Sequence, residues 1–242
     1  MSLRPSFIPV FASEEGGELG NNSMLIGGST MYLSPDEAWP TCETCSEPLV
    51  PLVQMNVSSE GTPDAFRALI PSVAPAGSSL ATMVQLFVCR DHDCYEEATM
   101  DMDARSWNVR LATVPLVPPP SNAPRLLEAR MEIENGEGFL PAQLVEIWTA
   151  GKEETWHWER MMGDASDEFY ALHEPEEGMK LLGHSVRGKY NYAQGERELI
   201  QLGDRDCWQE NEALGIMGLD GNIWIDQGVD PEVLTLGMSV TY

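Results

Sequence analysis

The chain has 242 residues, and its 14 Lys+Arg against 39 Asp+Glu give a net charge of −25. This charge excludes an ordinary nucleic-acid binder, because affinity for a phosphate backbone comes mainly from basic side chains, and it argues against docking on anionic membranes. An apolar fraction of 43% with seven Trp is too high for a disordered chain, so we expect one large domain or two small ones.

The amino-terminal stretch and the cysteine content bear on the cellular compartment of the protein. The apolar stretch from Phe7 to Phe11 is too short for the core of a signal peptide, and no window approaches the roughly 18 apolar residues of a membrane span. Five cysteines do not suggest a disulfide scaffold, and their number is odd. We therefore expect a soluble, cytoplasmic protein in which paired cysteines serve metal or redox chemistry.

Shifts in composition divide the chain into four expected segments. Gly and Glu residues mark a loose N-terminal arm over 1–22, and a Pro-rich stretch over 118–124 forms a stiff connector. Between them lies a first half, 23–117, and after the connector comes a second half, 125–242. Residues 128–177 hold fourteen Asp/Glu against three Lys/Arg, so the second half opens with a strongly acidic stretch.

Short apolar runs predict strands along both halves. In chain order, these expected strands are Met24–Ile26, Leu52–Val57, Met83–Val88, Trp107–Leu111, Glu198–Leu202, Asn222–Asp226 and Met238–Tyr242.

Fewer segments carry helical signals. Thr62 as the capping residue and Pro63 at the first helical position predict a helix that ends before Pro71. The i, i+3, i+4 spacing of apolar residues predicts an amphipathic helix over Pro141–Trp148, and Asp167–Leu172 predicts a short helical turn. Because the elements lack a βαβ rhythm, the expected fold class is α+β, with β-rich mixed sheets.

The two halves echo each other weakly. Two pairs of runs recur in the same order, LIGGS at 25–29 with LLGHS at 181–185, and LVQM at 52–55 with LIQL at 199–202. This recurrence predicts two weakly related halves that arose by internal duplication, although Gly turns and apolar strands also recur by chance. Gln54 and Gln201 stand at matching places, which predicts a shared structural role such as satisfying backbone groups between strands.

The cysteine spacing is the strongest chemical signal in the chain. Cys42 and Cys45 form a C-x2-C pair, and Cys89 and Cys94 form a C-x4-C pair where a predicted strand ends. Two close pairs about forty residues apart suit a tetrahedral thiolate site. Because soft thiolate ligands favour zinc in the cytosol, we predict a structural zinc site made by these four residues, with no open position for catalysis.

Other arrangements of the same residues remain open. His92, inside the second pair, could replace Cys94 as the fourth ligand. The four thiols could also stay reduced without a metal, or one of the two pairs could be oxidised to a disulfide. Cys207 stands alone and is expected to be an ordinary semi-buried thiol.

Recognisable catalytic signatures are absent from the sequence. The four histidines fall in no Ser/His/Asp or Cys/His signature, and no Gly-rich phosphate loop occurs. The conspicuous Trp156-His157-Trp158 run is more typical of a packed element edge than of a site. The alternative hypothesis is an enzyme or small-ligand binder of unrecognised type, with His157, His173 or His184 beside carboxylates in a cleft between the halves.

Taken together, the motifs resemble the YwqG-like family of uncharacterised proteins. The similarity lies in the Gly27-Gly28 turn, the segment from Trp39 to Gln54 that contains Cys42 and Cys45, and the stretches 199–202 and 215–224. The chain departs from the family where Gly218-Leu219-Asp220 stands in place of a Trp-Gly-Asp. The resemblance implies a mixed α/β fold with two related halves and no established activity.

The first half also resembles the programmed cell death protein 2 family. The Gly27-Gly28 turn, the Cys42–Leu49 segment, the Met83–Cys89 strand and the Trp107–Arg110 run occur in the order typical of that family. This resemblance implies a chaperone role toward a basic protein of the small ribosomal subunit.

The net charge and the absence of catalytic signatures lead to a prediction of function. A negative surface steers a cationic partner and keeps it soluble. We therefore expect a non-enzymatic acidic binding protein for a basic protein partner, either chaperone-like or as an immunity protein for a cationic toxin. Simple solubility is the plainer explanation of the charge. We expect no nucleic-acid and no membrane partner.

Overall fold

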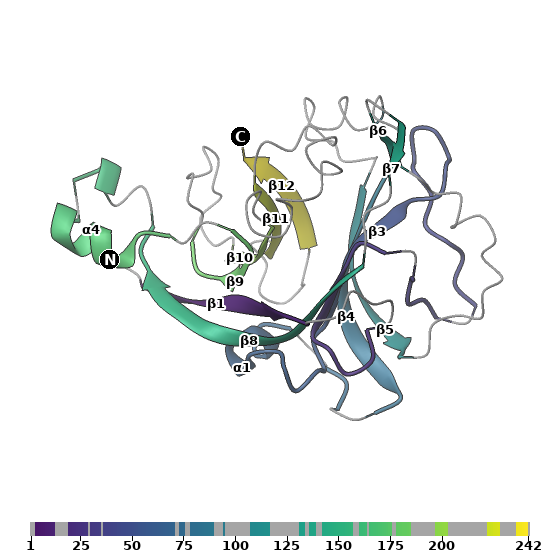
Figure 1. The fold of residues 1–242 in the computed structure, drawn as a ribbon, viewed down its shortest axis with the longest axis horizontal. Coiled ribbons are helices and arrows are strands. Elements are labelled where there is room, and N and C mark those ends of the chain that lie inside the picture. Colours follow the sequence, from purple (N-terminus) through teal and green to yellow (C-terminus); the bar gives the residue numbers. More distant parts are fainter. Residues whose placement is uncertain are drawn as a thin grey trace. The chain divides into compact units, whose positions relative to one another are not determined.

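The computed structural model describes the chain in segments, which Figure 1 draws as coloured ribbon. The described residues are 3–12, 19–28, 30–34, 36–70, 73–75, 78–89, 94, 107–116, 131–133, 136–138, 142–156, 160–163, 165–175, 178–184, 197–202, 222–227 and 236–241. The predicted connector 118–124 and residues His92, His157 and Cys207 lie outside them.

Contacts within the chain divide it into two compact units. We call the first the cysteine unit, Val10–Ile147 with Asn211–Gly218, and the second the C-terminal unit, Met1–Pro9 with Trp148–Glu210 and Leu219–Tyr242. Two strands, β1 (Arg4–Phe11) and β8 (Gln143–Glu154), contribute residues to both units. β1 occupies part of the segment that composition alone marked as a loose arm.

The cysteine unit is built on antiparallel strands in the order β8-β2-β3-β4-β5. Apart from β8, these strands are β2 (Met24–Ile26), β3 (Val50–Asn56), β4 (Leu80–Val88) and β5 (Trp107–Pro115). A separate two-stranded pair consists of β6 (Met131–Ile133) and β7 (Gly136–Gly138). The predicted strands in this part of the chain are therefore confirmed, with boundaries shifted by a few residues.

The C-terminal unit has the strand order β12-β11-β10-β9-β1-β8, again with antiparallel pairing wherever the register is known. Its remaining elements are α4 (Asp167–His173), β9 (Lys180–Leu182), β10 (Arg197–Leu202), β11 (Asn222–Gln227) and β12 (Leu236–Thr241). The helical turn predicted over 167–172 and the three predicted strands are confirmed. The described residues thus form a strand-rich fold with antiparallel pairing (Figure 1).

The helix predicted over Pro141–Trp148 is wrong, because residues 143–154 form strand β8. Val145 pairs with Met24 of β2, so the backbone groups of this segment bond to a neighbouring strand instead of within a helical turn. The spacing of the apolar residues was compatible with the helical repeat, but burial does not follow it: Val145 and Trp148 are buried, while Ile147 is exposed.

The helix predicted after Thr62 is confirmed as α1 (Asp64–Arg67), but it is shorter than expected. Pro63 precedes the first helical residue, and no side chain caps the helix. The Thr62 hydroxyl donates instead to the carbonyl oxygen of Asn56, 2.8 Å away. Thr62 therefore ties the turn after β3 together and does not serve as the predicted cap.

Buried apolar side chains from β2, β4 and β5 form one core of the cysteine unit, joined by Leu19 and Tyr32 from the loops. Gly27 and Gly28 both have positive φ, 63° and 75°, which confirms the predicted glycine turn after β2. A Cβ atom on Gly28 would come within 2.9 Å of the Cβ of Ala142, so side-chain packing also requires glycine there. Among the described residues, no helix is long and apolar enough to cross a bilayer.

Candidate metal centre

The first two cysteines lie in a tight turn between β2 and β3. An isolated bridge between Thr41 and Pro48 closes this turn. Within it, the Cys42 N–H donates to the carbonyl of Glu47 at 2.8 Å, and the Ser46 N–H donates to the carbonyl of Cys42 at 2.9 Å. Ser46 has φ of 64°, a left-handed conformation uncommon for a residue with a side chain. The backbone thus brings the C-x2-C sulfurs to one side of a closed turn.

The sheet register then brings the second pair to the first. Val50, the first residue of β3, pairs with Val88, the last residue of β4. Cys89 follows Val88 directly, so it leaves the sheet beside the end of the cysteine turn. Cys94 follows a few residues later and is 6% exposed. Pairing of β3 with β4 therefore explains why residues more than forty positions apart meet, given the roughly 4.8 Å spacing between strands.

The four sulfurs form a compact cluster. The Sγ atoms of Cys42, Cys45, Cys89 and Cys94 all lie within 4.8 Å of one another. The Sγ atoms of Cys45 and Cys89 are 3.6 Å apart, and none of these four residues is in a disulfide. In a tetrahedral site with metal–sulfur bonds of about 2.3 Å, the sulfurs would be about 3.8 Å apart. The spacing therefore fits a metal held by four thiolates, and neither of the two disulfides left open as alternatives is formed.

Apolar packing encloses the cluster on most sides. Cys42, Cys89 and Cys94 belong to a buried group that also contains Met31, Leu33, Leu49 and Phe87. Trp39 packs against this group, and its indole N–H donates to the carbonyl of Leu49 at 2.8 Å. Cys45 is the only cluster member that is not buried. Three of the four candidate ligands are thus buried among apolar side chains.

The surroundings of Cys42 favour its thiolate form. Burial raises the pKa of this thiol, but hydrogen bonds from the backbone N–H groups of Cys45 and Thr44 lower it, as do side-chain contacts with Cys45 and Cys89. The lowering contributions prevail, so the pKa lies below the ordinary thiol value. Metal binding requires deprotonated thiols, and the turn therefore prepares this residue as a ligand.

Two of the candidate histidines, His173 and His184, are among the described residues. His173 is half-buried at the end of α4, where its Nδ1 lies 2.9 Å from the carbonyl oxygen of Glu153. His184 is 4% exposed, and its backbone N–H donates to Oε2 of Glu154 at 2.7 Å. Both histidines belong to the C-terminal unit.

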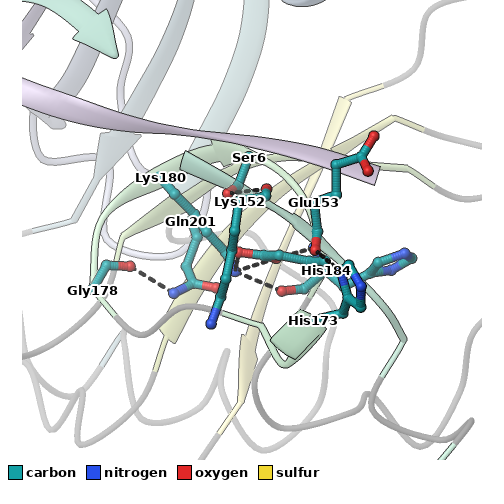
Figure 2. A network of polar contacts seen from close by, with 9 residues as sticks. Ser6, Lys152, Glu153, His173, Gly178, Lys180, His184 and Gln201 are labelled. Atoms are coloured by element: carbon teal, nitrogen blue, oxygen red, sulfur yellow. Dashed lines mark hydrogen bonds and ion pairs between the residues drawn. The ribbon is translucent and has the colours of Figure 1, made fainter. Parts of the chain in front are cut away.

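A second polar cluster lies inside the C-terminal unit, and sequence reasoning missed it. The Nζ of Lys180 donates to both carboxylate oxygens of Glu154 and to the carbonyl of His184 at 2.8 Å. Figure 2 shows these contacts between β8, β9 and the turn after β9, with Gln201 donating to Gly178 beside them. The signal that could have revealed this cluster is a lysine inside the apolar run Met179–Leu182.

A row of polar side chains also crosses three strands of the cysteine unit. Gln54 of β3 pairs with Gln85 of β4, which pairs with Arg110 of β5. The Gln85 amide donates to Oε1 of Gln54 at 3.2 Å, and its Oε1 accepts from Nε of Arg110 at 2.9 Å. The Arg110 guanidinium also pairs with Glu37. This row holds the loop that precedes the cysteine turn against the sheet.

The two matching glutamines do satisfy backbone groups, as predicted, but these groups belong to loops and not to the strands themselves. Gln54 donates from Nε2 to the carbonyl of Thr30 at 2.6 Å and accepts from the N–H of Tyr32 at 2.9 Å. Gln201 donates from Nε2 to the carbonyl of Gly178 at 2.6 Å. Both buried amides therefore satisfy loop backbone groups that lie outside the strand ladders.

Comparison of the sequence with protein-family models gives no match, and comparison with curated proteins gives no significant match.

Proposed function

We propose that this chain is a non-enzymatic, cytoplasmic binding protein for a basic protein partner, and that its four-cysteine cluster holds a structural zinc ion. The observation that carries the proposal is the set of four mutually close thiols from Cys42, Cys45, Cys89 and Cys94. Four protein sulfurs complete a tetrahedral shell and leave no position for water or substrate. The four-cysteine cluster thus has a structural role.

Zinc is the metal that suits this donor set best. Thiolates are soft ligands, and a reducing cytosol keeps them from pairing as disulfides. The ion would link the turn between β2 and β3 to the end of β4, two segments that the sheet register already brings together. Binding energy at such a site adds directly to folding stability, because the unfolded chain holds no preformed site.

The charge of the chain supports a basic protein as the partner. A net charge of −25 creates a negative field that attracts cationic surfaces and raises association rates. The resemblance to the programmed cell death protein 2 family agrees with this choice, because it implies a basic client. Membership of that family or of the YwqG-like family is part of the proposal.

The order of strands in each unit supports the proposed internal duplication. In one copy, β2 pairs with β3, and β3, β4 and β5 follow as antiparallel neighbours. In the other, β9 pairs with β10, and β10, β11 and β12 follow in the same way.

Turn geometry gives the duplication further support. Positive φ angles occur at Gly27 and Gly28 after β2, and at Leu182 and Gly183, at the end of β9 and just after it. If β1 is counted as the first strand of the copy β1–β5, and β8 as the first strand of the copy β8–β12, each first strand pairs with the second strand of the other copy. β1 pairs with β9, and β8 pairs with β2. The two copies would therefore have exchanged their first strands.

Metal analysis tests the zinc site. We expect the protein purified without added metal to contain about one zinc per chain, given the four-ligand closed site. Cys45→Ser and Cys89→Ser should each lower the zinc content strongly, whereas Cys207→Ser, which changes the fifth cysteine of the sequence, should leave it unchanged. Stoichiometric metal in the Cys89→Ser variant, or no metal in the wild type, would contradict this part of the proposal.

Recovery of partners at two salt concentrations tests the binding function. We expect proteins that bind the tagged full chain from its native cell to be basic, and to be released when salt rises from roughly 0.05 M to 0.5 M, because screening weakens charge attraction. Partners that are acidic or neutral, or retention that does not change with salt, would refute the proposal.

A further inference from the structure

Three strongly exposed apolar side chains lie in one short segment. Met161 is 61% exposed, Met162 is 74% exposed and Leu172 is 66% exposed, while other exposed large apolar side chains, such as Leu80 at 45% and Ile147 at 47%, are less than half exposed. We call residues 160–174 the hairpin segment. It contains the turn 160–163 and helix α4, and it lies in the C-terminal unit.

The hairpin segment is held in place by hydrogen bonds and side-chain contacts, although its apolar side chains are exposed. At the start of α4, the Ser166 hydroxyl accepts from the N–H of Phe169 at 3.2 Å. Arg160 stacks 4.8 Å over the ring of Tyr170 and lies 3.7 Å from the carboxylate of Asp167, which fixes the turn against the helix. These contacts tie the turn that carries Met161 and Met162 to α4.

The other end of α4 is bound to strand β8. The N–H of Thr155 donates to the carbonyl of His173 at 2.6 Å, and the His173 ring contacts the carbonyl of Glu153 at 2.9 Å. Tyr170 is buried on the packed side of the helix. Glu168, Ala171 and Leu172 are exposed, and positions 168 and 172 share one helical face.

The sequence that carries these apolar side chains is mostly acidic. Over 160–177 the sequence contains Arg160 and six acidic residues, Asp164, Asp167, Glu168, Glu174, Glu176 and Glu177. Arg160 already contacts Asp167. A second copy of this chain or an anionic lipid surface would be repelled, whereas a segment with Lys or Arg beside apolar side chains would be attracted. Methionine side chains adapt to partners of varied shape, which suits such a surface.

We propose that the hairpin segment is the docking surface for an amphipathic, Lys/Arg-rich segment of the basic partner. The apolar side chains of that segment cover Met161, Met162 and Leu172, and its cations pair with Glu168 and Glu174. This inference rests on the proposed binding function and adds the location and the partner chemistry.

Fluorescence anisotropy with synthetic peptides tests the surface on the full chain. The probe is a labelled helical peptide of Leu and Lys with one apolar face, and a second peptide carries Ser in place of each Leu. We expect the first to bind the wild type at least about tenfold more tightly than the second, because covering apolar side chains adds to charge attraction.

The variant Met161→Ser/Met162→Ser/Leu172→Ser should weaken binding of the Leu/Lys peptide at least about tenfold. The matched control is Leu80→Ser/Ile147→Ser, which removes two exposed apolar side chains of the cysteine unit and should leave affinity within about twofold. Circular dichroism of each variant checks the fold. As an independent readout, bound peptide should slow peroxide oxidation of Met161 and Met162, measured by mass spectrometry.

The outcomes separate the two proposals. Equal binding of both peptides, equal affinity of the triple variant and the wild type, or unprotected methionines would overturn the docking surface, while the binding function would stand on charge alone. If neither peptide binds the wild type at low salt, the proposed binding function fails, and the docking surface fails with it.

Discussion

The Nζ atom of Lys180 lies 2.6 Å from Oε2 of Glu154, and both side chains are completely buried. The third donor of the ammonium group reaches the carbonyl of His184 at 2.8 Å, so all three are used (Figure 2). The attraction between buried charges is strong, but removal of water from both is costly, so the pair is stabilising only while it stays complete.

Loss of one partner of this pair should therefore be severe. We expect Lys180→Met to lower the free energy of unfolding by about 3–5 kcal/mol, because it leaves the carboxylate of Glu154 buried without its cation. The double variant Lys180→Met/Glu154→Leu should recover much of the loss. Urea unfolding followed by circular dichroism measures both. A single variant as stable as the wild type would show that the pair is not closed to water.

Gly183 offers a test of the packing around the same pair. Its φ is 79°, and a Cβ atom there would lie within 2.9 Å of the Glu154 carboxyl carbon and 3.1 Å of the Ser6 Cβ. Gly163 has nearly the same φ, 77°, with open space around it.

We expect Gly163→Ala to cost about 1–2 kcal/mol from backbone strain, and Gly183→Ala to cost clearly more. Thermal unfolding of the two variants compares them directly. Equal losses would mean that the clash with Glu154 is relieved at no cost.

Gln85 is the centre of the polar row in the cysteine unit. Its amide donates to the carbonyl of Tyr32 at 2.8 Å as well as to Gln54, and its oxygen accepts from Arg110. Gln85→Leu leaves these buried groups without their partner, and we expect it to cost about 2–3 kcal/mol. Exposed Thr113→Ala on β5 should change stability by less than about 0.5 kcal/mol. Chemical denaturation measures both, and a neutral Gln85→Leu would exclude a structural role for the row.

Removal of the metal should act on the cysteine unit. A high-affinity chelator added to the zinc-loaded protein should lower the thermal midpoint, because the binding energy is part of the folding energy. Lower pH should have the same effect, since protons compete with zinc for the thiolates.

The direction of the pH effect follows from Cys42. Its pKa is lowered in the folded chain, so its thiolate contributes stability above the ordinary thiol pKa, and the contribution is lost as pH falls through the lowered value. Zinc release on acidification, followed with a metal indicator, checks this. A thermal midpoint unaffected by the chelator would argue against a structural ion.

Much of the candidate metal site could be predicted because cysteine pairs carry their chemistry in their spacing. Cys42 and Cys45 need only one local turn, and Cys89 follows an apolar run that reads as a buried strand. The strands were predictable for a similar reason, since β3 and β4 are continuous runs of buried apolar residues around Gln54 and Gln85.

The rest depends on contacts between distant parts of the chain. β8 has helical spacing, yet pairing with β2 decides its conformation. Glu154 and Lys180 are 26 positions apart, and neither residue type predicts burial. Their meeting depends on where β8 and β9 lie around β1, which a local pattern does not encode.

The pairing of β1 with β9 has a consequence for biosynthesis. Ser6 lies opposite Leu182, so β1 is made long before β9, one of its two neighbours in the ladder. Until then the edge of β1 that faces β9 presents unpaired backbone N–H and C=O groups, which other chains could join. Newly made protein should accordingly depend on protection against aggregation, and a stalled product that ends before residue 180 should be the species most prone to it.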